Sequence, residues 1–243
     1  MEHHELLLQA VVLLAALLQA ATGIGFGVIA GPVILLVIND GAAIQVSIVL
    51  SFLIAAVLSP SLRGSVDRPA LKLFLIGSAV GLPLGIVVFL NVGIDLLKLL
   101  AGLAVLFMAA AVAGLFGRVK TQKATAGPDF GVGVLSGVMC TSLAMPGPVP
   151  AAWMSARSLP KATIRATTLA LFVFSYVAAF AFQAGLAGVE KETWWLTASL
   201  VPATLIGVFL GRLAVNWITE VAFRRLITVI LAATAVTLLA SVI

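Results

Sequence analysis

Two long apolar runs are broken by glycine and proline at corresponding places in the two halves of the chain. The first break, Gly23-Ile24-Gly25-Phe26-Gly27, is followed by Gly31-Pro32-Val33. The second break, Thr141-Ser142-Leu143-Ala144-Met145-Pro146, leads directly into Gly147-Pro148-Val149. A continuous membrane helix has no use for such breaks, because lipid cannot satisfy the backbone groups that they release. Paired interruptions in two halves indicate instead a binding site built from discontinuous helices.

The composition places the chain in a lipid bilayer. Of the 243 residues, 62% are apolar and 9% are charged, and the mean hydropathy is +1.23. Soluble domains carry about 25% charged residues. The net charge of +5 comes from basic residues scattered in short clusters between apolar runs, which is not the pattern of a nucleic-acid surface. We therefore expect a lipid bilayer, and no nucleic acid, as a partner.

Ten apolar segments divide into two similar sets. Each half has two short or interrupted segments, followed by three that are long enough to cross the hydrocarbon layer, which takes ~20 residues. The segments are 6–21, 28–38, 42–62, 70–92 and 94–116, then 130–142, 149–158, 164–186, 194–215 and 223–243. The predicted fold is an all-α integral membrane protein of two repeats, 1–117 and 130–243, joined by a polar linker, 118–129.

Local signatures recur in the same order in both halves. Gly-Pro-Val at 31–33 recurs at 147–149, and a Gly-x-x-x-Gly pair at 81 and 85 recurs at 207 and 211. Their common order favours a duplication. The Gly-x-x-x-Gly pairs are more typical of helix packing within the fold than of a dimer interface. A homodimer remains a possible assembly.

Two topologies are compatible with these segments, and the distribution of basic residues distinguishes them. If each interrupted segment crosses fully, the halves are parallel. If each is a re-entrant hairpin, the halves are inverted, and all Lys and Arg except Lys98 and Lys191 lie on one side, which is twelve of the fourteen. Because Lys and Arg favour the cytoplasmic side, we predict inverted repeats, each a broken-helix hairpin plus three transmembrane helices. Both termini would then lie outside a plasma membrane or cell inner membrane.

Several segments carry a resemblance to a known family. The glycine-rich stretch ending in Gly31-Pro32, the loop 63–67 (Arg-Gly-Ser-Val-Asp) and the Gly81/Gly85 helix resemble the sulfite exporter TauE/SafE family. The Gly147-Pro148 and Gly207/Gly211 segments and 223–226 (Phe-Arg-Arg-Leu) are similar to its second repeat. The resemblance covers nearly the whole chain and implies a membrane transporter for small anions such as sulfite or sulfonates. The second break departs from the family's usual glycine-rich hairpin.

The two breaks supply the candidate binding residues. A hairpin whose tip reaches mid-bilayer exposes unpaired N–H groups at the start of its second arm, and the helix dipole adds a positive potential there. Glycine allows close backbone approach, and hydroxyls add donors. The candidates in the tips are Thr22, Gly23, Gly25, Phe26, Gly27, Thr141, Ser142, Met145 and Gly147. Helix packing is the alternative explanation for the glycines.

Arg165 and Gln45 are two further candidates, at equivalent places in the two halves. A guanidinium at the start of segment 164–186 can bind a sulfonate in bidentate fashion. Alternatively, Arg165 is an interfacial anchor. Other polar residues within spans, including Gln19, Ser51, Ser175 and Gln183, are expected to hydrogen-bond between helices.

The remaining composition argues against catalysis. Both histidines are in the first four residues, Cys140 is the single cysteine, and all nine carboxylates fall in termini, loops or span ends. An intramembrane enzyme needs a nucleophile with a base, paired carboxylates or metal ligands. We predict no enzyme activity, no cofactor and no metal site. The leading prediction is an exporter of a small anion, sulfite or an organosulfonate. The alternative is a structural or assembly subunit without transport of its own.

Overall fold

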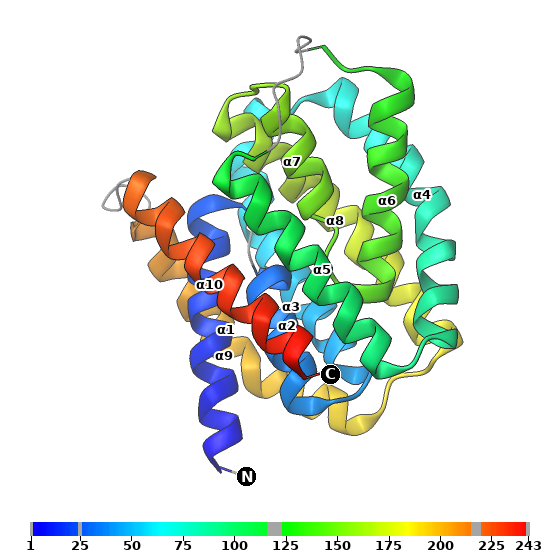
Figure 1. Cartoon of the computed structure of the whole chain (residues 1–243), viewed down its shortest axis with the longest axis vertical. Coiled ribbons are helices and arrows are strands. Elements are labelled where there is room, and N and C mark those ends of the chain that lie inside the picture. Colours follow the sequence, from blue (N-terminus) through cyan, green and yellow to red (C-terminus); the bar gives the residue numbers. More distant parts are fainter. Residues whose placement is uncertain (1, 24–25, 116–122, 215–219, 242–243) are drawn as a thin grey trace.

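The computed structural model describes residues 2–23, 26–115, 123–214 and 220–241. Over these residues the chain is entirely helical, with ten α-helices, one 3-10 helix and no strand (Figure 1). The helices are α1 (Glu2–Thr22), α2 (Phe26–Ile38), α3 (Ala42–Leu58), η1 (Ser59–Ser65), α4 (Arg68–Asn91), α5 (Ile94–Ala113), α6 (Ala126–Leu143), α7 (Pro148–Ala156), α8 (Lys161–Leu186), α9 (Lys191–Ala214) and α10 (Glu220–Ala240).

Five helical segments are long and apolar enough to cross a membrane: Ala42–Leu62, Arg68–Asn91, Ile94–Ala113, Lys161–Leu186 and Lys191–Leu213. They match five of the six spans predicted from the sequence. The sixth prediction falls on α10, whose described apolar part is Val229–Ala240. Large apolar side chains on these helices are exposed, among them Leu84, Val87 and Phe209, as expected where lipid is the solvent.

Both predicted breaks are real interruptions of a helix. Gly23 follows α1 with φ 81°, and Ala144 follows α6 with φ 58°. A left-handed residue at this position is a common way to end a helix. The N–H of Gly23 bonds to the carbonyl of Gln19, and that of Ala144 to the carbonyl of Cys140. After each stop the chain turns back as a shorter helix, α2 or α7. The two breaks therefore stop their helices in the same way.

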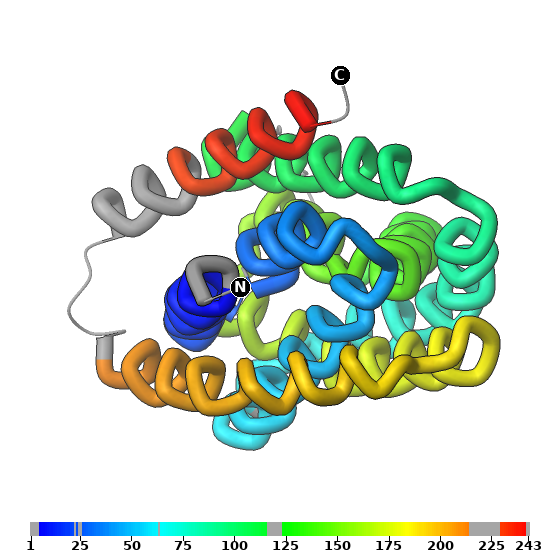
Figure 2. Tube along the Cα trace, turned by 90° about the horizontal axis from the view of Figure 1, so that it is seen from below, coloured from blue at the N-terminus to red at the C-terminus, as the bar shows by residue number. Residues whose placement is uncertain are grey.

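The two hairpins enter the bundle from opposite ends. Figure 1 shows α1 rising from the end where the N-terminus lies, whereas α6 descends from the other end, and the chain begins and ends at the same end of the molecule. α2, at 13 residues, is about 20 Å long, too short to cross the hydrocarbon layer. Nine of its residues are buried. The view along the helices shows α2 and α3 between α5 and α10 on one side and α9 on the other (Figure 2).

The helices of the two halves pack against one another in corresponding pairs. α1 packs on α9 and α4 packs on α6; α3 pairs with α8 and α5 with α10. If α1 to α5 are matched in order with α6 to α10, the α1–α9 pair corresponds to the α6–α4 pair. The α3–α8 and α5–α10 pairs each correspond to themselves. Each of the four pairs therefore takes one helix from each half.

Glycines form the closest of these contacts. A Cβ added at Gly81 or Gly85 of α4 would meet the carbonyl oxygens of Val134 and Val138 on α6. The α9 glycines Gly207 and Gly211 face the α1 carbonyls of residues 13 and 17 in the same way. Small residues let helix backbones touch in a membrane. The prediction that these glycines pack helices within the fold is confirmed.

Replacing Gly137 with Leu tests the α4–α6 contact. A Cβ at Gly137 would lie 2.6 Å from the Ser78 carbonyl oxygen and 2.9 Å from the Leu82 nitrogen. Such overpacking costs about 1–3 kcal/mol or more, and each kcal/mol lowers the melting temperature by about 2–4 °C in a chain of this size. Heating in detergent with a thiol-reactive dye measures unfolding, because Cys140 is the single cysteine and is buried.

Gly131→Leu is the matched control on the same helix. A Cβ there would meet nothing within 4 Å, so this variant should melt within a degree or two of the parent protein. Equal melting temperatures for the two variants would contradict the close packing of α4 on α6.

Candidate functional site

The first tip, between α1 and α2, is held by side chains from its first arm, α1, and from α8. Arg165 of α8 donates from Nη2 to the carbonyl of Ala20, in the last turn of α1. Its side chain also lies against Gly23, where a Cβ would collide with it. Gln19 accepts through Oε1 from the N–H of Phe26, the first residue of α2, at 2.9 Å. The last carbonyls of α1 and the first N–H of α2 therefore find partners inside the protein.

The second tip, residues 144–147, is held by the same helix, α8. Gln183 donates from Nε2 to the carbonyl of Thr141 at 2.6 Å. The Tyr176 hydroxyl donates to the carbonyl of Ala144 at 3.1 Å. A third bond comes from α6 itself, where Ser136 Oγ donates to the carbonyl of Pro146 at 2.7 Å. All three donors are buried.

The positions along α8 show that the tips lie at different depths. Arg165, at the first tip, is in the second turn of α8, whereas Tyr176 and Gln183, at the second tip, lie further along. At 1.5 Å per residue, about 16 Å of helix separates Arg165 from Tyr176. The first tip, at Gly23, therefore lies nearer the start of α8 than the second tip does.

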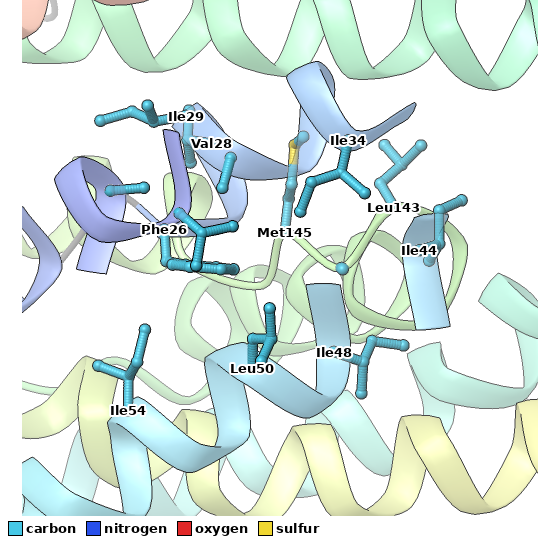
Figure 3. Packing of buried hydrophobic residues seen from close by; sticks show 14 of the residues in the cluster. Phe26, Val28, Ile29, Ile34, Ile44, Ile48, Leu50, Ile54, Leu143 and Met145 are labelled. Carbon is cyan, nitrogen blue, oxygen red and sulfur yellow. The ribbon is translucent and has the colours of Figure 1, made fainter. Parts of the chain in front are cut away.

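The start of α2 lies against the second tip. Gly27 has no side chain, which lets the carbonyl of Ala144 approach its backbone closely, and the Tyr176 hydroxyl is 3.6 Å from the position of a Gly27 Cβ. Figure 3 shows Met145 extending from the second tip beside Ile34 of α2. We call this place the tip junction and define it by Gln19, Gly27, Ser51, Ala144 and Tyr176. Ser51, on α3, interacts electrostatically with the Tyr176 hydroxyl.

The tip junction contains buried donors without partners. Within the described residues, Nε2 of Gln19 makes no hydrogen bond, although its side chain is 1% exposed. Ser51, 0% exposed, directs its hydroxyl to that of Tyr176. Nε of Arg165 at the first tip is also without a partner there. An unpaired buried donor costs about 1–3 kcal/mol, so a group that accepts these bonds would be stabilised.

Sequence reasoning treated Gln19 and Ser51 as groups that hydrogen-bond between helices. That prediction is confirmed for Gln183, which binds the second hairpin from α8. For Ser51 of α3 the interaction is with the Tyr176 hydroxyl of α8. For Ser175 the prediction is wrong, because its hydroxyl makes no hydrogen bond within the described residues. The signal that could have marked Gln19 is its place one turn before the break, where its side chain reaches the N-terminus of the helix that follows.

The structure brings most of the sequence candidates into one buried region but leaves some apart. Gly23, Phe26 and Gly27 in the first hairpin, and Thr141, Ser142, Met145 and Gly147 in the second, are buried. Gly25 and the side chain of Thr22 lie outside the described residues.

Two candidates have contacts that define other roles. Gln45 is not at either tip, because its Nε2 donates to the carbonyl of Gly188 in the α8–α9 connection at 2.8 Å. Gly147 lies against the Phe172 ring, 2.8 Å from where its Cβ would be.

The second hairpin has fewer backbone donors than the sequence argument assumed. Pro148 and Pro150 both stand in the first turn of α7, and proline has no N–H. The N–H of Ala151 already bonds to the carbonyl of Gly147 at 3.1 Å. The start of α2 has no proline in its first turn, so it is the richer source of donors.

A second polar cluster lies at the linker end of the molecule. The fully buried Arg157 guanidinium lies 3.5 Å from Asp129 Oδ1, which is also fully buried, and 3.7 Å from Asp67 Oδ2. Trp153 Nε1 donates to the same Asp129 oxygen, and Asp67 caps α4 by accepting from the N–H of Ala70. The cluster thus ties α4 of the first half to α6 and α7 of the second.

A bundle of membrane-length helices in which two broken helices meet near their tips, with Gly27 against Ala144, is typical of membrane transporters. The family described as "Sulfite exporter TauE/SafE" matches residues 8–238, and the chain belongs to this family. The resemblance noted in the sequence is therefore confirmed. No curated protein and no solved structure matches the chain.

The family consists of membrane exporters of sulfur anions and not of enzymes. The chain is accordingly a multi-pass membrane protein with a lipid bilayer and an anion as partners, and the prediction that it is not an enzyme is confirmed. Within the described residues no group of three or more His, Cys, Asp and Glu side chains could hold a metal ion.

Replacing Arg157 with Gln should strongly destabilise the fold. It leaves the Asp129 carboxylate buried without its cation, a change that costs about 3–5 kcal/mol. The double variant Arg157→Gln with Asp129→Asn should recover part of this loss, because the buried negative charge is removed as well. The Cys140 dye melt measures both variants. Arg212→Gln, at an exposed arginine of α9, should melt like the parent. A melting temperature for Arg157→Gln equal to that of Arg212→Gln would contradict the structural role of the cluster.

Proposed function

We propose that this chain exports a small sulfur oxyanion, sulfite or an organosulfonate, which binds at the tip junction during its passage. The observation that carries this proposal is the unpartnered amide of Gln19. Its Oε1 is fixed by the N–H of Phe26, so its Nε2 stands at the start of α2 as a buried donor with nothing to bind among the described residues.

The available groups at this place suit an anion. Gln19 Nε2 and Ser51 Oγ are both able to donate, and the N-terminal end of α2 adds the positive end of a helix dipole. Oxyanions bind readily at helix N-termini because the first N–H groups of a helix have no partner within it. A sulfonate group has three oxygens that can accept these bonds.

The other tip residues are proposed to line the path of the substrate. Gly23, Gly25, Phe26, Gly27 and Thr22 belong to the first hairpin. Thr141, Ser142, Met145 and Gly147 belong to the second. Arg165 stands between the first tip and the linker end of α8, where it can receive an anion before the tip junction does.

We further propose that the two halves are inverted repeats, residues 1–117 and 130–243. The support is the corresponding pairing of helices and the opposite entry of α1 and α6 in Figure 1. The ends of the described helices place Arg68, Lys123, Arg157, Lys161 and Arg212 toward the linker end. Because basic residues favour the cytoplasm, the linker is proposed to be cytoplasmic and both termini to lie outside.

Membrane potential alone can drive the export. Moving one negative charge out of an inside-negative cell yields about 2.3 kcal/mol per 100 mV, a roughly 50-fold concentration ratio. Proton-coupled transporters place ionisable groups within their spans. The buried charged side chains among the described residues are Lys98, Asp129 and Arg157, and all of them lie toward the helix ends. Electrogenic export without a proton is therefore the proposed mechanism.

Proteoliposomes that contain the full chain test the proposal. Loaded with radiolabelled sulfite in sodium-free buffer, they should release sulfite faster when a potential is imposed that is negative inside. Ser51→Ala should lower this rate about tenfold or more, the value of one hydrogen bond to a charged group. The same variant should melt within a few degrees of the parent protein, because it removes only one hydroxyl, which lies near that of Tyr176.

Ser47→Ala is the matched control on α3. Ser47 Oγ donates to the carbonyl of Ala43 in its own helix at 2.8 Å, so its loss should leave sulfite release unchanged. Uphill movement driven by a pH gradient at zero potential would contradict the electrogenic mechanism. Absence of any protein-dependent sulfite release would favour the alternative, a structural or assembly subunit.

Single cysteines in a Cys140→Ala background test the orientation. A cysteine in place of Glu190, in the α8–α9 connection, should react with an impermeant reagent added to intact cells. A cysteine in place of Ser158, between α7 and α8, should react only after the cells are opened. Both positions are exposed or partly exposed, so burial does not limit labelling. Reaction at both positions from outside would rule out the inverted arrangement.

A further inference from the structure

We infer that the substrate bound at the tip junction carries a single negative charge, as hydrogen sulfite and simple organosulfonates do, and that dianions such as sulfate are rejected. This inference rests on the proposed function and concerns the same site. It comes from comparing the donors available at the tip junction with the formal charges near it.

The donors that the tip junction offers are neutral. Gln19 contributes an amide, and Ser51 a hydroxyl. Tyr176 and the carbonyl of Ala144 already bind each other. No Lys, Arg or His is among the residues that define the tip junction, so hydrogen bonds and the dipole of α2 are what it can contribute to holding an anion.

The fully buried charges elsewhere do not supply a cation to this place. Lys98 Nζ lies 2.6 Å from Asn39 Oδ1, at the end of α2 opposite to the tip junction. Arg157 is enclosed by Asp129 and Asp67. These two are the buried cations of the described residues, and both belong to polar contacts at the ends of the helices.

One guanidinium, that of Arg165, approaches the first tip from the side. It contacts Ala20, the residue after Gln19, and its Nε is buried without a partner. The exposed Arg212 acts on Arg165 electrostatically, but among the described residues Arg165 is the cation whose side chain contacts the first tip. Its charge can balance a single negative charge on the ligand. A dianion would leave one charge uncompensated within the membrane.

The cost of that second charge is large. The energy of moving an ion from water into a medium of low dielectric constant grows with the square of its charge, so a dianion loses about four times as much solvation as a monoanion of equal size. Neutral donors recover this cost only in part. Charge, rather than shape, is therefore the property by which this site sorts small sulfur anions.

Methanesulfonate and sulfate make a matched pair for the test, since both are tetrahedral and similar in size but carry one and two charges. Full-chain proteoliposomes loaded with unlabelled sulfite take up labelled sulfite by counterflow in mildly acidic buffer, in which hydrogen sulfite is the main form of the substrate. Each competitor is added outside over a range of concentrations. Methanesulfonate should inhibit at concentrations lower than those of sulfate by about tenfold or more.

Two variants change the positive charge near the site in opposite directions. Gln19→Lys adds a cation at the start of α2 and should narrow the difference between the two competitors, because sulfate gains the larger benefit. Arg165→Gln removes the nearby cation and should weaken inhibition by both. Lys72→Gln, at an exposed lysine of α4, should behave as the parent. The Cys140 dye melt identifies any variant that does not fold, and the parent protein alone still decides the question.

The possible outcomes distinguish failure of the monoanion inference from failure of the proposed sulfite export. Sulfate that inhibits as well as methanesulfonate, or better, overturns the monoanion inference and leaves sulfite export intact. Failure of both competitors to inhibit sulfite counterflow overturns it in the same way. Absence of sulfite counterflow itself removes the proposed function and, with it, this inference.

Discussion

The structure depends on satisfying backbone groups at helix ends that lie inside a membrane. A helix that stops within the hydrocarbon layer releases carbonyls and N–H groups that lipid cannot bind. α8 meets most of this need alone, because Arg165 binds a carbonyl at the end of α1, and Gln183 and Tyr176 bind carbonyls of the second hairpin. One helix that crosses the whole bundle thus supports both broken helices.

The buried polar group that remains without a hydrogen-bond partner is therefore informative. The polar groups that α8 and the hairpins pair with one another are structural, whereas Gln19 Nε2 is left without a partner at the place where the hairpins meet. A fold that pairs its tip carbonyls and yet leaves this buried amide donor unpaired offers it to an acceptor from outside the chain. This contrast, more than the presence of polar residues in spans, supports an anion at the tip junction.

The sequence predicted much of the architecture because its signals are local. Gly and Pro mark the breaks after Thr22 and Leu143, and apolar length marks the spans, so the helices were predicted to within a few residues. The Gly81/Gly85 and Gly207/Gly211 pairs also indicated close packing, since small residues four apart have few other uses in a membrane helix.

The partners of individual polar side chains could not be predicted in this way. Gln183 and Thr141 are far apart in the sequence, as are Arg157 and Asp67, and nothing local shows that they meet. Asp67 and Asp129 looked like ordinary residues at turns and linkers, and only the packing of α4 on α6 and α7 brings them both to Arg157. The depth of each tip likewise depends on how α1 and α6 slide along their partners, which the sequence does not encode locally.

The glycine contacts also limit how this protein can change shape. In the α1–α9 and α4–α6 pairs, backbone lies on backbone with no side chain between, and each pair joins one half of the chain to the other. If one half swung past the other as a rigid body, both seams would have to open at once. A change of shape that keeps both seams closed has to move each of these helix pairs as one unit, made of one helix from each half.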